Sequence, residues 1–250
     1  MKSMEVTTLI RCATLEKQRM WISRVISVDK LRYQILDINI VALINQPTLQ
    51  LPNPPAAFQT EEFESIFRPA ITYSQGLAFD PSRGAAMTHQ YESMVSQKVI
   101  AVSPLRLDVH DRSGKQQETP SDLPELFLKT VAALNINTIQ ALGINCELQF
   151  KVQDVAAKVI ATKALADVQA FAPEGSRVQG GAARFYFNGS EGALYTIVIE
   201  PRNQDLTTNM IWMSCNYHIP KSAIPSIDEL SVLHGHSFTA VMRFTEGLFG

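Results

Sequence analysis

The residues most suited to acid–base or metal chemistry are the histidines His89, His110, His218, His234 and His236. His110 follows Asp108 in an alternating stretch, and a histidine beside a carboxylate can serve as a general base. His218 ends a comparable stretch later in the chain. We therefore take His110, Asp108 and His218 as candidate catalytic residues. The alternative is that both histidines are solvated polar residues at strand ends.

The remaining patterns point away from metal and cofactor chemistry. His234 and His236 are two residues apart in a predicted helix, which places them about 200° apart around its axis, so they cannot hold one ion from one face. We expect His234 to be a core or subunit-contact residue. Because HExxH and CxxC motifs are absent from the sequence, we predict no metal site and no cofactor.

The sequence offers little for nucleophilic or phosphate chemistry. It has no Gly-x-Ser-x-Gly motif, and Cys215 lies in an alternating stretch that predicts an inert, half-buried thiol. The glycine-rich segment 175–181 lacks the Lys-Ser/Thr ending of a P-loop and precedes a predicted strand. We therefore expect no phosphate-binding loop.

Length and charge limit the classes of protein that remain. A chain of 250 residues with 46% hydrophobic and 18% charged residues forms one large domain or two small ones. A net charge of −2 disfavours a dedicated nucleic-acid binder. Residues 1–34 hold seven of the 22 basic but only three of the 24 acidic residues. This segment predicts either a basic arm for an acidic partner or the solvated face of a short helix over 15–28.

Cysteine usage and hydropathy predict a compartment. Cys12, Cys146 and Cys215 are an odd number of widely spaced cysteines, which favours a reducing environment. Charged residues interrupt the first 32 residues, and no apolar stretch approaches the ~20 residues of a membrane span. We expect a cytoplasmic protein with no membrane contact.

Hydrophobic periodicity predicts mixed α and β structure. Thr60, Ser121 and Ser226 have the side chains of helix N-caps, and Asn188-Gly189 is typical of a tight hairpin turn. Strands are expected over 31–44, 85–93, 97–103, 105–110, 143–152, 182–188, 192–200 and 207–218. Helices are expected from residue 60 and over 121–141, 154–171 and 226–248.

The order of these elements repeats. Residues 31–142 and 143–250 each read as strand, helix, three strands and helix. Gly84-Ala85-Ala86 and Gly181-Ala182-Ala183 open the two sets of strands 97 residues apart, and Leu123 and Ile227 begin the two last helices 104 residues apart. We predict an α+β fold: a mostly antiparallel, curved sheet with long helices on one side, built from two duplicated units that follow an N-terminal arm or helix over 1–30. The two units could also form one continuous domain.

Three runs, 100–110, 142–148 and 210–218, with Leu233, His234 and Phe238 after them, resemble a sporadically distributed family of bacterial proteins of similar length and unknown function. That family has a mid-chain strand with the pattern Gly-hydrophobic-Arg-Tyr-hydrophobic-Asn. Gly143, Ile144 and Asn145 fit this pattern, whereas its Arg-Tyr pair is missing. The likeness covers residues 95–250. It implies an uncharacterised bacterial protein and assigns no catalytic residues.

Two functional hypotheses follow from the sequence. The first is a non-enzymatic interaction or assembly module that binds another protein or a second copy of itself, based on Met210, Trp212 and Met213 gathered on one strand. The alternative is a small-molecule-binding protein or hydrolase, with a pocket between sheet and helices and a histidine base. Nucleic-acid binding through the basic arm is the weakest reading.

Overall fold

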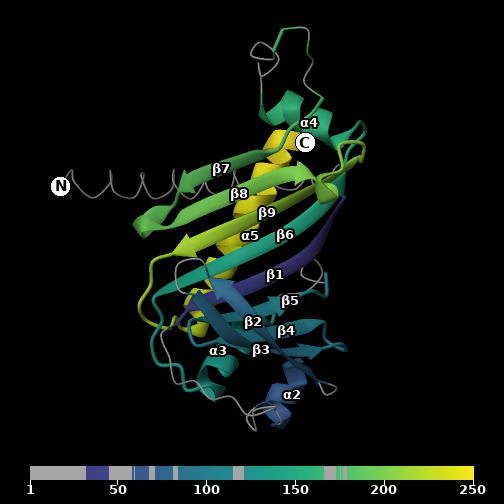
Figure 1. Cartoon of the computed structure of the whole chain (residues 1–250). Coiled ribbons are helices and arrows are strands. Elements are labelled where there is room, and N and C mark those ends of the chain that lie inside the picture. Colours follow the sequence, from purple (N-terminus) through teal and green to yellow (C-terminus); the bar gives the residue numbers. More distant parts are fainter. Residues whose placement is uncertain are drawn as a thin grey trace, which may run out of the picture. The chain divides into compact units, whose positions relative to one another are not determined.

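The described residues contain nine strands, which form one sheet in the order β2-β3-β4-β5-β1-β6-β9-β8-β7 (Figure 1). Every neighbouring pair is antiparallel. The α+β class with an antiparallel sheet is thus confirmed. The strands are β1 (Tyr33–Leu43), β2 (Ile71–Asp80), β3 (Gly84–Ser93), β4 (Lys98–Ser103), β5 (Arg106–Asp111), β6 (Ala141–Lys151), β7 (Ala183–Asn188), β8 (Leu194–Pro201) and β9 (Met210–Ile219).

The computed structural model describes residues 32–44, 58, 60–67, 71–80, 84–114, 121–165, 173–174, 176 and 179–250. Residues 33–249 form one compact unit. The expected arm over 1–30 and Cys12 lie outside the described residues. None of the described helices is both long enough and apolar enough to cross a membrane. The unit boundary expected between residues 142 and 143 falls inside β6, in the middle of the sheet.

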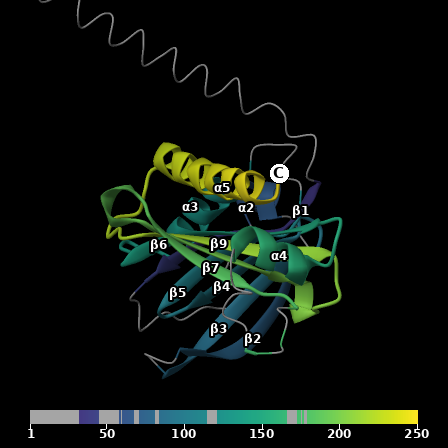
Figure 2. The ribbon, with the colours of Figure 1, turned by 90° about the horizontal axis from the view of Figure 1, so that it is seen from above.

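Helices cover one face of the sheet (Figure 2). The longest, α5, packs on β6 and β9, and α3 packs on β1 and β5 and against α5. Figure 2, with the helices at the top, also shows β3 and β2 turning away from the helix layer. The face of the sheet opposite these helices is called the open face. The helices are α2 (Glu61–Phe67), α3 (Leu123–Ala133), α4 (Ala156–Ala164) and α5 (Ile227–Phe249).

Alternation along the central strands decides which side chains reach each face. In β1, Ile38 and Ile40 are buried on the helix side, so Asp37 and Asn39 point to the open face. In β5, Leu107 and Val109 are buried, as the sequence predicted. The same rule gives β6 and β9 one apolar and one polar face. The alternation of apolar and polar side chains along each central strand thus places polar groups on the open face.

Helix starts agree better with the sequence than helix ends do. The Oγ1 of Thr60 accepts from the Phe63 N–H at 3.3 Å, and the Oγ of Ser226 accepts from the Glu229 N–H at 3.2 Å, so both caps are confirmed. The helix expected over 121–141 ends at Ala133, because Asn135 adopts a left-handed φ of 52°. The helix expected over 154–171 has the bounds of α4, Ala156–Ala164.

One strand was missed, and one turn was assigned wrongly. The sequence reading missed β2, whose polar and small residues lack a clear apolar alternation. The tight Asn188-Gly189 turn is instead a loop over 189–193, in which Glu191 and Gly192 take positive φ values of 55° and 77°. Gly192, rather than Gly189, therefore supplies the left-handed conformation that closes this hairpin.

Two glycines should respond to alanine substitution in opposite directions. A Cβ on Gly180 would lie 2.2 Å from the Ala157 Cβ and 3.0 Å from its backbone carbonyl carbon, so we expect Gly180→Ala to cost about 1–3 kcal/mol. Gly235 is inside α5 with nothing within 4 Å of such a Cβ, so Gly235→Ala should add about 0.5–1 kcal/mol. Urea unfolding of both variants measures the difference. Equal effects would contradict the close packing of residue 180 on α4.

Candidate functional site

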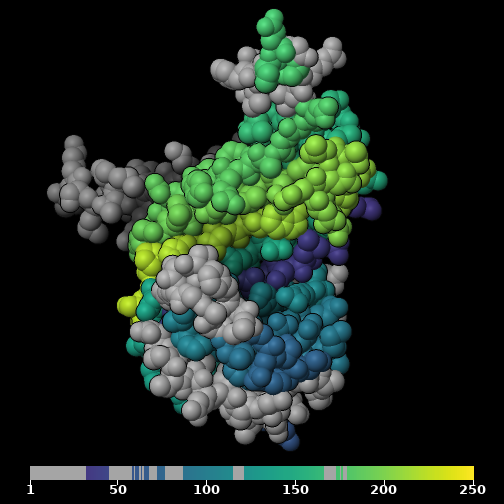
Figure 3. All heavy atoms as spheres, viewed as in Figure 1, coloured from purple at the N-terminus to yellow at the C-terminus, as the bar shows by residue number. Residues whose placement is uncertain are grey.

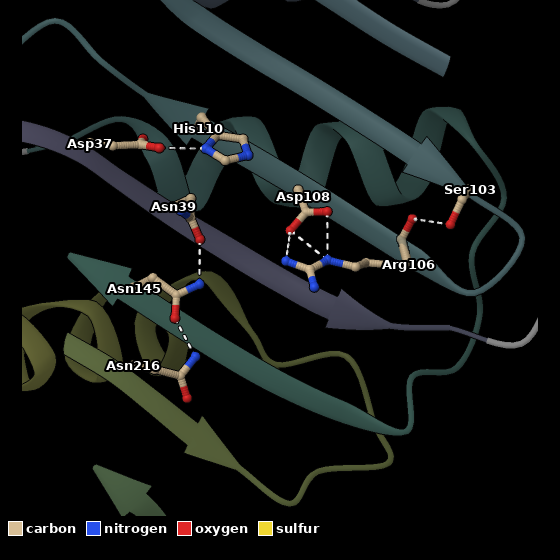
Figure 4. Close-up of polar contacts among 8 residues, drawn as sticks. All are labelled: Asp37, Asn39, Ser103, Arg106, Asp108, His110, Asn145 and Asn216. Carbon is tan, nitrogen blue, oxygen red and sulfur yellow. Dashed lines mark hydrogen bonds and ion pairs between the residues drawn. The ribbon is translucent and has the colours of Figure 1, made fainter. Parts of the chain in front are cut away.

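A row of polar side chains crosses the four central strands on the open face. Asn39 of β1 pairs in register with His110 of β5 and with Asn145 of β6, and Asn145 pairs with Asn216 of β9. Because neighbouring strands lie about 4.8 Å apart, these side chains stand side by side (Figure 4). Residues from four separate parts of the chain therefore form one continuous polar surface.

The three asparagines of this row form a directional hydrogen-bond chain. The Nδ2 of Asn216 donates to the Oδ1 of Asn145, and the Nδ2 of Asn145 donates to the Oδ1 of Asn39 at 2.6 Å (Figure 4). The Oδ1 of Asn216 and the Nδ2 of Asn39 lie outside this chain. The row thus ends in an acceptor at β9 and in a donor at β1, on the side toward β5.

Asp37 and His110 form a close pair next to this row. The Nδ1 of His110 lies 2.7 Å from the Oδ2 of Asp37, and their side chains are 18% and 12% exposed (Figure 4). The carboxylate can only accept, so it holds a proton on Nδ1 and leaves Nε2 as the acceptor of the neutral ring. This is the arrangement by which an acidic residue orients a histidine base.

The second carboxylate oxygen of Asp37 is unsatisfied. Its Oδ1 is buried and has no hydrogen-bond partner among the described residues. The Nε of Arg112 lies 3.9 Å from Oδ2, which is beyond hydrogen-bonding distance. A buried acceptor without a donor costs about 1–3 kcal/mol of stability, so the position of Asp37 is unfavourable for folding.

These groups line a pocket on the open face, with a volume of about 570 Å³. Figure 3 shows the surface hollowed between the blue segment of β2–β3 and the green-yellow segment of β7–β9, with purple β1 exposed in the hollow. The volume is within the ~300–1,000 Å³ of ligand pockets. The lining includes Leu36, Asp37, Asn39, Arg106, His110, Arg112, Asn145, Glu147, Ser214 and Asn216.

Glu147 is the second acid of the pocket. It pairs in register with Asp37, across β1 and β6. Burial first, and then the charge of Asp37, raise the pKa of Glu147, while a hydrogen bond from the Trp212 side chain opposes the shift. A carboxyl group whose charged form is disfavoured can donate a proton as well as accept one.

The raised pKa of Glu147 predicts a measurable cost in stability. The folded state holds this proton to a higher pH than the unfolded state, whose value is near 4.5, so stability falls as pH rises from 4.5 through the folded value. Glu147→Gln should remove that fall and raise the melting temperature at pH 7 by about 1–3 °C. Glu200→Gln, on the same face of β8, serves as the control with no expected change. A lower melting temperature for Glu147→Gln would contradict the conclusion that the charged form of Glu147 destabilises the folded state.

The predicted partner of His110 was wrong. Asp108 is instead held by Arg106, whose Nε and NH2 groups donate to its carboxylate at 2.7–2.9 Å (Figure 4). Asp37, which is 73 residues away in sequence, takes the place expected for Asp108. His218 is exposed on the same face of the sheet, opposite Gly143, and is not part of the pocket lining.

Asp37, Asn39 and Asn145 were missed by sequence reasoning. The segment 31–44 was read only as an apolar strand, although Asp37 and Asn39 alternate there with Ile38 and Ile40. Polar residues at every second position of an otherwise apolar strand point to a second, polar face. That signal could have found the first two residues, but not their partners.

The other candidate groups do not add to the pocket chemistry, although Cys215 borders the pocket. Cys146 and Cys215 pair in register on β6 and β9 as buried free thiols, and burial raises the pKa of Cys215 to about 12, so neither is a ready nucleophile. Burial lowers the pKa of His234, in α5. Among the described residues, no group of three His, Cys, Asp or Glu side chains could hold a metal ion.

Comparisons with protein families, with curated proteins and with solved structures gave no match for this chain. We therefore infer function from the geometry of the pocket.

Proposed function

We propose that this protein binds a small polar molecule in the pocket on the open face of its sheet, with His110 positioned by Asp37 to accept a proton from that molecule. The observation that carries the proposal is the 2.7 Å contact between His110 Nδ1 and Asp37 Oδ2 at the wall of a pocket of about 570 Å³. A buried acid that orients a histidine is costly for stability and suits a functional site. The alternative hypothesis of the sequence thus gains support for a small-molecule pocket. The expected position of that pocket, between sheet and helices, was wrong, because the pocket lies on the face opposite the helices.

A thermal-shift screen against a metabolite library tests this proposal. A ligand that binds only the folded state stabilises it by about 2.7 kcal/mol at a hundredfold excess over Kd, and this raises the melting temperature. His110→Ala should abolish the shift. His218→Ala is the matched control, because His218 is on the same face but outside the lining, and it should keep the shift. Ligands whose shifts survive His110→Ala would overturn the proposal.

Self-association remains a second proposal, now on a different surface. The methionine and tryptophan cluster that first suggested it is not an exposed patch, because Met213 is fully buried and Trp212 bonds to Glu147. Instead, β7 is the last strand of the described sheet and carries Tyr186 and Phe187, which are 62% and 41% exposed. An outer strand with exposed aromatic residues favours pairing with a second copy.

Light scattering at micromolar concentration tests this second proposal. We expect a dimer for the natural chain and a monomer for Tyr186→Lys. A strict monomer of the natural chain would contradict it.

We further propose that the fold arose by duplication of a strand–helix–three-strand–helix unit, to which the first half adds the outer strand β2. The sheet order supports this, since β5, β4 and β3 follow β1 outward as β9, β8 and β7 follow β6. Asn39 and Asn145 pair with each other at the centre, each after an isoleucine. In that symmetry His110 corresponds to Asn216 rather than to His218. An alignment of homologous sequences that shows no similarity between residues 31–142 and 143–250 would contradict duplication.

A cytoplasmic site of action and membership of the bacterial family remain proposals as well. Cys146 and Cys215 face each other across β6 and β9 as free thiols, which favours a reducing compartment. Cell fractionation tests the location, and recovery outside the cytoplasm would overturn it.

A further inference from the structure

The charged groups of the pocket balance one another. Arg106 is paired with Asp108, and Arg112 lies 3.9 Å from Asp37, so each arginine has a carboxylate beside it. Burial and the charge of Asp37 disfavour the charged form of Glu147, and His110 is neutral when it acts as a base. A pocket for an anion or a cation needs an excess of the opposite charge, because desolvating a charged ligand is otherwise uncompensated. The balance of charges therefore favours a ligand without net charge.

Hydrogen-bonding groups of both kinds surround the same space. The Nε2 of His110 and the Oδ1 of Asn216 are acceptors, whereas the Nδ2 of Asn39 and the Arg112 guanidinium are donors. Donors and acceptors alternate across strands that are about 4.8 Å apart. A ligand that satisfies them must itself donate and accept at several closely spaced positions, as hydroxyl groups do.

The lining also argues against a flat aromatic ligand such as a nucleobase. Leu36 is the one large apolar side chain among the residues of the described lining, and none of them is aromatic. Base recognition depends on stacking against aromatic or planar side chains. The nearby Trp212 donates its side-chain hydrogen bond to Glu147 and is not part of the lining.

We propose that the ligand of this pocket is a neutral, hydroxyl-rich molecule of the saccharide class. This inference rests on the proposed function, since it names the ligand of the same pocket. A saccharide hydroxyl can accept from the Asn39 amide and donate to the Oδ1 of Asn216, which lies outside the asparagine chain. Another hydroxyl placed at His110 Nε2 is the group whose proton the ring would accept.

The test is an NMR titration of the full chain with matched sugars. The probes are neutral glucose, galactose, mannose, maltose and lactose, the anionic glucuronate and the cationic glucosamine, observed through the side-chain amide signals of Asn39, Asn145 and Asn216. We expect at least one neutral sugar to shift these signals, with at least tenfold weaker binding of both charged probes. Tighter binding of a charged probe, or no shift with any neutral sugar, would overturn the saccharide inference.

Two variants separate charge recognition from simple structural damage. Asp37→Asn leaves an excess positive charge and should shift the preference toward glucuronate, whereas Arg112→Gln should shift it toward glucosamine. Structural damage would weaken all probes alike and so would contradict the inference. If library compounds of another class bind and depend on His110, the saccharide inference fails while the proposed function stands. If no compound of any class depends on His110, both fail.

Discussion

Replacing Asp37 by asparagine is expected to release the His110 ring from its single tautomer. In the natural chain the carboxylate accepts from Nδ1 at 2.7 Å, so the neutral ring keeps its proton there and presents Nε2 as an acceptor. An amide can rotate to donate or to accept, and both tautomers then become available. For any reaction that uses this ring as a base, we expect a loss of about 10²–10⁴ in rate.

The tautomer can be measured without knowing the ligand. Long-range ¹H–¹⁵N NMR at a pH where the ring is neutral should show an unprotonated Nε2 in the natural chain and a mixture in Asp37→Asn. Asp108→Asn is a matched control, because Asp108 lies two residues before His110 on the same strand but bonds to Arg106. The same tautomer in all three proteins would show that Asp37 does not orient the ring.

Replacing Lys98 by methionine is expected to lower the free energy of unfolding by about 3 kcal/mol. The Lys98 side chain is 7% exposed, its ammonium group pairs with the carboxylate of Asp122, and it donates to the Ile66 carbonyl at 3.4 Å. Removing the ammonium therefore leaves the Ile66 carbonyl without this donor and the Asp122 carboxylate without its cation.

Chemical unfolding measures this loss, and calorimetry should show a fall of about 6–12 °C in melting temperature. The double variant Lys98→Met with Asp122→Asn should recover part of the loss, because it removes the carboxylate that has lost its cation. Lys158→Met is the control, since its pair with Asp154 is exposed on α4 and should be worth less than about 0.5 kcal/mol. A similar loss for both lysine variants would contradict the importance of burial.

The pocket shows how far a local pattern reaches. The alternation of Leu107 and Val109 with polar residues predicted that His110 lies on a polar strand face. The structure confirms that Leu107 and Val109 are buried on the other face. Nothing within a few residues of His110 indicates that its partner is Asp37, because β1 and β5 are distant in sequence and become neighbours only when the sheet forms. Asp108 is the nearest acid on the same face of β5, but Arg106, on the same side of the same strand, occupies its carboxylate.

Local chemistry was sufficient wherever a structure depends on neighbours along the chain. The caps at Thr60 and Ser226 and the alternation of β5 and β6 are interactions over a few residues, and the sequence predicted them. Strand β2 was missed, since its residues 71–80 show no clear apolar alternation in the sequence.

The sequence by itself determined the α+β class, the antiparallel strands and the apolar face that the helices cover, because burial follows the period of the side chains. Only the tertiary structure decided the strand order, and with it the meeting of Asp37, His110, Asn145 and Asn216 in one pocket. The physical reason is that register between distant strands is set by the packing of whole faces, which no single segment encodes.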